Sequence, residues 1–329
     1  MGLKAVVAFA TDHKFHYYTG VALYTLIEHS SPERRYEILI LADSLTSADS
    51  AIFTRLVEGR PNFSLRIIEM REKIAELGAE NFYVGSYAIA NYYRLFLHEL
   101  LPEYDRVLYL DSDIVVQSDV GELFDTDLGN FMLGAVKDRA ATLKEQLEQI
   151  TYIKKTLKIR YPGKYFNSGV LLMDLDKMRN SDFSQRIRSE INSGIAFKFV
   201  DQDILNRIFG DKIYYLDATW NHMIQSRKHT KGKKIVHFPG IRPWLSEWNP
   251  LAALWWSVAE KTFFVQDLKQ AVYVSSGRIE YLETIEKLYY GVLRSTSWRL
   301  TGFLRAVSNV ARWCVKWGRK LCAGMIQGR

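Results

Sequence analysis

Two aspartates that stand one residue apart, directly after an apolar run, are the most informative feature of the sequence. Residues 107–110 precede Asp111 and Asp113, and the apolar residues 114–116 follow. Apolar residues at successive positions are typical of a strand that is covered on both faces. Carboxylates at the end of such a strand need a compensating partner, because an isolated charge in a dry interior is very costly. Two side chains that alternate around Ser112 can turn toward one divalent cation, so the pair predicts a metal site for a phosphate-bearing donor.

The alternative interpretation of the aspartate pair is a surface turn with two solvated carboxylates. The elements that precede the pair favour the metal site. Their apolar patterns predict strands at residues 4–10, 37–41, 64–69 and 106–111, and helices at residues 19–30, 48–57 and 87–100. This alternation is typical of an α/β domain with a largely parallel sheet, in which ligands bind beyond the carboxyl ends of the strands. Asp12, Asp43 and Asp111 each stand at such an end, although Asp12 could instead cap the following helix.

The nucleotide-binding loops that are commonest in α/β proteins are absent from the sequence. The first strand is followed by neither a Gly-x-Gly-x-x-Gly pattern nor a Gly-rich loop that ends in Lys-Ser/Thr. The sequence therefore disfavours dinucleotide-dependent oxidoreduction and ordinary ATP hydrolysis as functions. A nucleotide in this protein would have to be held in another way.

The second half of the sequence contains three further clusters of polar residues beside apolar runs. Residues 165–175 combine a polar segment and a glycine with a buried strand, and residues 235–244 predict a short strand that leads into a rigid loop. Residues 199–206 begin a helix with acidic residues, which could be caps because the first turn of a helix favours negative charge. Asp174 and Asp203 are expected to cap helices or to pair locally.

Taken in order, these segments resemble the family 8 retaining glycosyltransferases, which have a GT-A fold. The resemblance covers about residues 4–250, and the order of the motifs is more specific than any one of them. The matching elements are Ala10-Thr11-Asp12, Tyr93-Arg94-Leu95, Leu110-Asp111-Ser112-Asp113, residues 166–172, Asp201-Gln202-Asp203, and His237-Phe238-x-Gly240 followed by Arg242, Pro243 and Trp244.

The resemblance implies a single Rossmann-like nucleotide-binding domain of the α/β class with a mixed central sheet, in residues 1–258. It also implies transfer of a hexose, glucose or galactose, from a UDP-sugar to a surface-glycan or lipid-linked saccharide, with retention of the anomeric configuration. Mn²⁺ or Mg²⁺ would bind Asp111, Asp113 and His237 together with the donor diphosphate. The imidazole in this ligand set favours Mn²⁺.

The resemblance further assigns the donor contacts. Ala10 and Asp12 would meet the uracil and its ribose, while Gly240 and Arg242 would hold the diphosphate. The sugar hydroxyls would contact Arg94, Asn167 and Asp201. Gln202 would lie next to the anomeric carbon. Ser112 and Ser168 would also belong to the donor-binding site. A neutral Gln202 is a poor nucleophile, so same-face attack is favoured, in which a donor phosphate oxygen takes the acceptor's proton; Asp201 as a nucleophile is the alternative.

One position departs from the family pattern. A lysine usually follows the glycine at a spacing of two residues or more, whereas Arg242 follows Gly240 after a single residue. Arginine can clamp a phosphate in bidentate fashion, but the geometry of the two side chains is not interchangeable.

Charge is distributed unevenly along the chain. The net charge of +7 includes nine basic residues and no acidic one from Lys287 to the end, which leaves −2 for the first 286 residues. From Trp298 onward, apolar residues at helical spacing oppose a purely cationic face. Residues 259–329 are therefore predicted to be a basic, helical extension that binds an anionic membrane surface. Packing on the body or on a second subunit is the alternative, and nucleic acid is the least favoured partner.

The only two cysteines, Cys314 and Cys322, form neither a disulfide framework nor a metal cluster, which suits a reducing cytoplasm. Together with the basic extension, this predicts a cytoplasmic enzyme that is peripheral on the inner face of the cell membrane. Three alternative functions stay open: a glycogenin-like protein that glucosylates one of its own tyrosines, a metal-dependent nucleotidyltransferase, and a membrane-surface interaction protein without catalysis.

Overall fold

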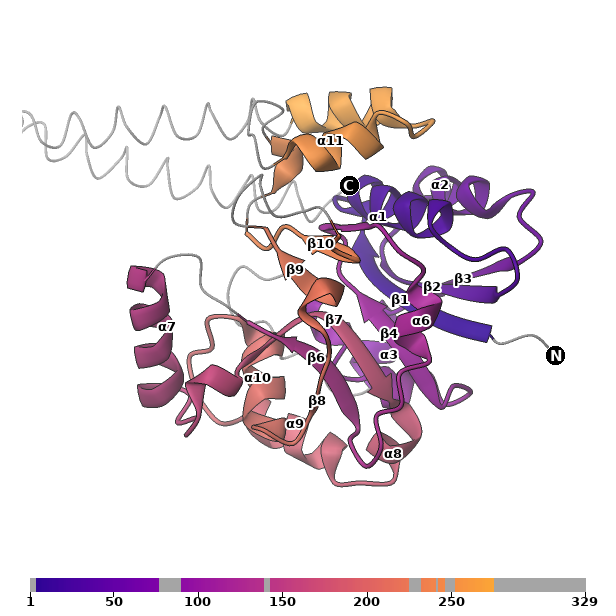
Figure 1. Ribbon diagram of the computed structural model, residues 1–329. Coiled ribbons are helices and arrows are strands. Elements are labelled where there is room, and N and C mark those ends of the chain that lie inside the picture. The colour runs from indigo at the N-terminus through magenta and orange to yellow at the C-terminus, as the bar shows by residue number, and fades with distance from the viewer. Residues whose placement is uncertain are drawn as a thin grey trace, which may run out of the picture. The chain divides into compact units, whose positions relative to one another are not determined.

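A sheet of seven strands forms the centre of the protein, in the order β3-β2-β1-β4-β7-β6-β8 (Figure 1). Strand β7 runs antiparallel to both of its neighbours, whereas the other neighbouring pairs are parallel. The predicted α/β class with a mixed central sheet is therefore confirmed. The strands are β1 (Lys4–Asp12), β2 (Arg35–Asp43), β3 (Phe63–Glu69), β4 (Arg106–Leu110), β6 (Leu133–Lys137), β7 (Phe166–Asp174) and β8 (Tyr214–Tyr215).

The computed structural model describes residues 4–76, 90–138, 143–224, 232–240, 242–245 and 252–274. The chain divides into two units, Met1–Gln266 and Asp267–Arg329, and only residues 267–274 of the second unit are described. The basic segment from Trp298 onward thus lies outside the described residues, and the predicted division into residues 1–258 and 259–329 stays a prediction. None of the described helices is both long and apolar enough to span a membrane.

The register of the parallel strands brings three acidic residues to one edge of the sheet. Asp12 pairs with Asp43 at the ends of β1 and β2, and Phe9 pairs with Leu110 at the end of β4. Asp111 follows β4 directly, so it emerges at this same edge. The sequence-based expectation that acidic residues gather where the strands end is confirmed.

Helices cover both faces of the sheet (Figure 1). Helices α1 (His16–Glu28) and α2 (Ser47–Val57) lie on one face, where a Thr46 capping box begins α2. The opposite face packs against a continuous apolar cluster that includes residues of α4 (Ala90–Tyr93), α5 (Leu97–Leu100), α8 (Leu175–Arg179), α9 (Phe183–Ile191) and α10 (Val200–Phe209). Other described helices are α3 (Arg71–Glu76), α6 (Val120–Phe124), α7 (Leu143–Lys155), η2 (Pro162–Lys164), η3 (Ala218–Asn221), η5 (Pro243–Leu245) and α11 (Ala253–Ala259).

The single helix predicted for residues 87–100 is wrong in its continuity. The chain forms α4 and α5 with a break at residues 94–96, and residues 87–89 lie outside the described part. Leu95, Phe96 and Leu97 are all fully buried. Residues 94–96 form a turn between the two helices, so Arg94 leaves the helical path.

A second, three-stranded sheet brings a distant segment to the aspartate pair. Its order is β5 (Ile114–Val116), β10 (Ile235–His237) and β9 (His222–Met223). In the antiparallel pairing of β10 with β5, His237 lies opposite Ile114. The N–H of Phe238 also donates to the carbonyl of Asp113 at 2.9 Å. Backbone pairing therefore places His237 beside Asp113 across 124 positions of sequence.

Asn206 of α10 fixes this helix to the start of β7. Its Oδ1 accepts from the N–H of Phe166 at 2.9 Å, and its Nδ2 donates to the carbonyl of Phe166 at 2.8 Å. We expect Asn206→Ala to lower the free energy of unfolding by about 2–4 kcal/mol, because each buried backbone group left unpaired costs about 1–3 kcal/mol. Urea unfolding measures the change.

Asn192→Ala is the matched control for this prediction. The Nδ2 of Asn192 donates to the carbonyl of Arg188 at the exposed end of α9. We expect a change within about 0.5 kcal/mol, as for most surface substitutions. Equal effects of the two variants would contradict the anchoring role of Asn206.

Candidate active site

Asp111, Asp113 and His237 bring their ligand atoms together at the edge of the central sheet. All of these atoms lie within 4.8 Å of one another. The Nε2 of His237 is 3.1 Å from Oδ1 of Asp113 and 3.8 Å from Oδ2 of Asp111. The two carboxylates are partly exposed, whereas His237 is buried. The three residues expected to converge on a cation therefore do converge, from β10 and from the segment between β4 and β5.

The tautomer of His237 is set by a buried amide. Asn221 donates from its Nδ2 to Oδ1 of Asn167 at 2.8 Å, so its own Oδ1 is left to accept from Nδ1 of His237 at 2.8 Å. The proton on Nδ1 leaves Nε2 facing the carboxylates. Burial would lower the pKa of His237, but attraction to Asp113 and Asp111 outweighs this effect and raises the pKa. A ligand histidine held by a polar outer partner is the usual arrangement at metal sites, and the donor set fits a divalent transition metal.

Gly169 of β7 provides the space beside these ligands. A Cβ atom at this position would collide with Cε1 of His237 and would lie 2.7 Å from Oδ2 of Asp111. The N–H of Asp111 donates to the carbonyl of Gly169 at 2.9 Å, so the two backbones cannot separate without breaking the sheet. A glycine is therefore required here by close approach to the ligand side chains.

Arg94 supplies the positive charge of the site. Its Nη2 is 2.8 Å from Oδ1 of Asp111, and its Nη1 is 3.2 Å from Oδ2 of Asp201. Nη1 also donates to the carbonyl of Ser168 at 2.9 Å, and the guanidinium lies over the ring of Tyr109. The side chain is buried, so both ion pairs act with little solvent screening. The break between α4 and α5 thus places the guanidinium of Arg94 among the carboxylates.

The two aspartates of the pair have opposite electrostatic environments. Burial raises the pKa of Asp111, and repulsion by Asp113 adds to this effect although Arg94 opposes it. Burial also acts to raise the pKa of Asp113, but its attraction to His237 outweighs burial and the pKa is lowered. His237 therefore compensates the charge of Asp113, and Arg94 compensates that of Asp111.

A hydrogen-bond network from β7 and α10 surrounds Gln202. The Oε1 of Gln202 accepts from Nδ2 of Asn167 at 3.0 Å and from the N–H of Ser168 at 3.1 Å. Its Nε2 donates to Oδ2 of Asp138 at 2.9 Å. Asp201 accepts from the hydroxyl of Ser168 at 2.7 Å. The amide of Gln202 is therefore held at both ends, and Asp201 forms tertiary pairs instead of capping α10.

The end of β1 joins this region through hydroxyl groups. The Oγ of Ser112 donates to the carbonyl of Ala10 at 3.2 Å and is 2.7 Å from Oγ1 of Thr19. Asp12 accepts through Oδ1 from the N–H groups of Lys14 and Phe15, at 2.8 and 2.9 Å. Burial raises the pKa of Asp12. One carboxylate oxygen of Asp12 thus closes the turn before α1, close to the capping role considered as an alternative.

Comparison with known proteins decides the family. The model of the family described as "Glycosyl transferase family 8" matches residues 6–248. The chain belongs to glycosyl transferase family 8. It is 24% identical over 233 residues to a putative glycosyltransferase of Haemophilus influenzae, a match that covers 70% of this chain and 67% of that protein.

Two further comparisons involve a lipopolysaccharide enzyme and a solved structure. The lipopolysaccharide 1,2-glucosyltransferase of Escherichia coli is 28% identical over 171 residues, and the match spans 47% of this chain but only 49% of the E. coli protein. The structure of galactosyltransferase LgtC in complex with donor and acceptor sugar analogues is 26% identical, with a TM-score of 0.63. The match covers 78% of this chain and 96% of LgtC.

The structure of this family 8 protein leaves the expected diphosphate contacts less defined than the rest of the site. Gly240 and Arg242 follow β10 and are exposed, with φ angles of 74° and 46°. Within the described residues, no hydrogen bond or ion pair joins Arg242 to Asp111, Asp113 or His237. The diphosphate role of Arg242 therefore stays a prediction, as do the contacts expected for the other donor-binding residues.

Two partners in the site of this glycosyltransferase carry no recognisable signal in the sequence. Asn221 holds His237 and Asp138 holds Gln202, yet neither stands in a motif. In contrast, Asp174 caps α8 through the N–H of Lys177, and Asp203 accepts from Tyr152, Tyr165 and the N–H of Phe199. The expected cap is confirmed for Asp174, whereas Asp203 pairs with two tyrosines that are distant in the sequence as well as with the N–H of Phe199.

We expect Gly169→Ala to weaken Mn²⁺ binding by more than about 100-fold. The added Cβ displaces His237 and Asp111 directly, and changes even to outer partners of ligands cost about 10–100-fold. Electron paramagnetic resonance of free Mn²⁺ measures the affinity. Gly163→Ala is the matched control, because a Cβ there meets no atom within 4 Å. Unchanged Mn²⁺ affinity in a folded Gly169→Ala protein would rule out this position of the metal.

Proposed function

We propose that this family 8 glycosyltransferase transfers glucose or galactose from a UDP-sugar to a surface-glycan or lipid-linked saccharide, with retention of configuration. The observation that carries the proposal is the convergence of Asp111, Asp113 and His237 beside Gly169, with Arg94 paired to Asp111. Membership of the family favours glycosyl transfer over nucleotidyl transfer. The similarity to LgtC, solved with donor and acceptor sugar analogues, supports a sugar-nucleotide donor.

Asp111, Asp113 and His237 would hold a divalent cation, which we propose to be Mn²⁺. When bound, such an ion supplies positive charge for the diphosphate that departs from the sugar. The mixed oxygen and nitrogen donors support a transition metal over Mg²⁺, which prefers oxygen ligands. Arg242, on the loop after β10, would add a second positive charge for the departing UDP.

The contacts of Gln202 and Asp201 support same-face attack over a covalent intermediate. Both ends of the Gln202 amide are engaged, by Asn167 and Ser168 on one side and by Asp138 on the other. The carboxylate of Asp201 is paired with Arg94 and accepts from Ser168, which lowers its nucleophilicity. We propose that these residues position the hexose and stabilise positive charge on its ring, while a donor phosphate oxygen accepts the acceptor's proton.

We expect Asp113→Asn to lower kcat/KM for the UDP-sugar by about 100-fold or more, because loss of a preorganised charge at a reacting phosphate has effects of this size. The assay measures release of UDP from UDP-glucose and UDP-galactose in the presence of Mn²⁺. Asp105→Asn is the matched control, since Asp105 is an exposed aspartate directly before β4.

Analysis of all the released products, together with the intact mass of the protein, decides among the alternative functions. Release of hexose 1-phosphate in place of UDP would favour a nucleotidyltransferase, because transfer of the uridylyl group from a UDP-sugar leaves that product. Growth of the protein's own mass in hexose steps would favour self-glucosylation. No UDP release with either donor across a panel of saccharide acceptors would contradict a hexosyltransferase.

We also propose that the basic segment near the C-terminus brings the enzyme to the inner face of the cell membrane. The proposal rests on the sequence alone, because this segment lies outside the described residues. The similarity to a lipopolysaccharide glucosyltransferase supports an acceptor that is linked to lipid. An apolar face opposite a cationic face is suited to an anionic bilayer surface.

We expect deletion of residues 295–329 to move the protein from the membrane fraction to the soluble fraction, because the deletion removes both faces of the predicted helix. Replacement of Arg305, Arg312, Lys316 and Arg319 by glutamine keeps the apolar face and tests the electrostatic part. Fractionation followed by quantitative immunoblotting measures both variants. A full-length protein that is soluble from the start would contradict the membrane proposal.

A further inference from the structure

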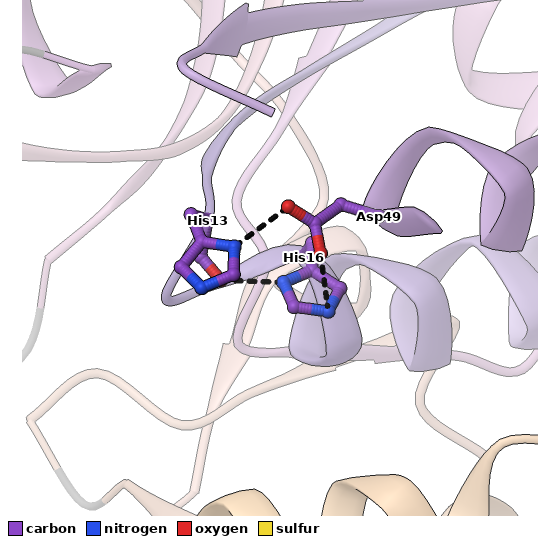
Figure 2. Close-up of side chains that lie close together, drawn as sticks. All are labelled: His13, His16 and Asp49. Atoms are coloured by element: carbon purple, nitrogen blue, oxygen red, sulfur yellow. Dashed lines mark hydrogen bonds and ion pairs between the residues drawn. The ribbon is translucent and has the colours of Figure 1, made fainter. Parts of the chain in front are cut away.

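A second cluster of imidazole and carboxylate groups lies at the start of α1, apart from the residues assigned to the transferase site (Figure 2). His13 belongs to the turn after β1, His16 is the first residue of α1, and Asp49 lies in the first turn of α2. Ligand atoms of the three side chains all lie within 4.8 Å of one another. Figure 2 shows the two imidazoles on the same side of the Asp49 carboxylate.

The tautomer of His16 is fixed by the backbone. Nδ1 of His16 is 2.5 Å from the carbonyl oxygen of His13, which can only accept, so Nδ1 carries the proton. Nε2 then presents a lone pair, and it faces Oδ1 of Asp49 at 3.4 Å. Burial lowers the pKa of His16 although Asp49 opposes this effect, so the neutral imidazole is favoured at neutral pH. A lone pair opposite a carboxylate oxygen is repulsive unless a cation lies between them.

The other two groups already pair with each other. Nδ1 of His13 donates to Oδ2 of Asp49 at 2.6 Å, and a cation bound to this nitrogen would replace the shared proton. This carboxylate is itself fixed, because Oδ2 accepts from the N–H of Thr46 at 2.9 Å within the capping box of α2. The side chains of His16 and Asp49 are each 6% exposed, whereas that of His13 is 53% exposed. The cluster is therefore rigid on its buried side and open to solvent at His13.

We propose that His13, His16 and Asp49 form a second metal site, which binds Zn²⁺ or a similar transition-metal ion. Two imidazoles, one carboxylate and a position open to water are a ligand set typical of zinc. Mg²⁺ and Ca²⁺ prefer oxygen ligands and are disfavoured at this site. No step proposed for hexosyl transfer uses these residues. A bound ion would tie the turn after β1, which begins directly after Asp12, to the start of α2.

The experiment is a calorimetric Zn²⁺ titration of full-length protein that lacks a histidine tag and has been dialysed against a chelator. Every protein in the series carries Asp113→Asn, which weakens the first site. We expect the parent to bind one Zn²⁺ per chain at this cluster and the added change His13→Ala to weaken that binding by more than about 100-fold. His13 is mostly exposed, so its replacement leaves the core intact.

Two further variants sharpen the result. Asp49→Asn removes the ligand charge but retains an oxygen that can accept from Thr46, and it is expected to weaken Zn²⁺ binding as His13→Ala does. His29→Ala removes an exposed histidine at the C-terminal end of α1 and is expected to leave the Zn²⁺ affinity unchanged. Zn²⁺ is also expected to raise the Tm of the parent but not that of the His13→Ala protein, because it binds the folded state.

Equal Zn²⁺ affinity with and without His13→Ala and Asp49→Asn would overturn the proposal. A Co²⁺ derivative whose spectrum shows thiolate-to-metal charge transfer would also overturn it, because the ion would then be bound by Cys314 or Cys322. The readout is metal binding, whereas the proposed transferase function is tested by UDP release. Failure of one proposal is therefore distinguishable from failure of the other.

Discussion

Compensation of buried negative charge is the constraint on which the rest of the structure depends. Asp111, Asp113 and Asp201 bring three carboxylates to one edge of the central sheet, and Arg94 is the guanidinium paired with two of them. A buried ion pair is strongly destabilising if one partner is lost, because the other charge is left without compensation. The break between α4 and α5 releases Arg94 from a helical path, and its guanidinium reaches both carboxylates.

The backbone of β7 provides the space in which these charged groups can meet. Its antiparallel course beside β4 places Gly169 against Asp111, and the missing side chain leaves room for the imidazole of His237. The small sheet of β5, β10 and β9 then delivers His237 from the far part of the sequence. Asn206 ties α10 to β7, and this attachment holds Asp201 and Gln202 within hydrogen-bond distance of Ser168. Sheet register therefore sets the positions of Gly169 and His237, and the attachment of α10 to β7 sets those of Asp201 and Gln202.

The parts of this arrangement that could be predicted are those with a local or ordered signal in the sequence. Apolar runs located the strands, and the order of motifs located Asp111, Asp113 and His237 before their proximity was known. The break at Arg94 was not predicted, because burial of successive residues depends on what packs around them. Asn221 and Asp138 were missed for a related reason: single polar residues acquire a role only through tertiary contacts. His13, His16 and Asp49 likewise converge only when α2 packs beside α1.

Charge at the first site also explains why a divalent cation suits it better than a further basic side chain. With His237 neutral, three carboxylates face a single guanidinium, and Arg94 is already engaged by Asp111 and Asp201. The site is then negative overall and would repel a diphosphate. A monovalent cation would leave it negative, whereas a divalent ion would neutralise the remaining charge and could also bind phosphate oxygens. The positive charge for the proposed departing UDP would then come from outside this group, which is the chemical reason to propose the exposed Arg242 for that task.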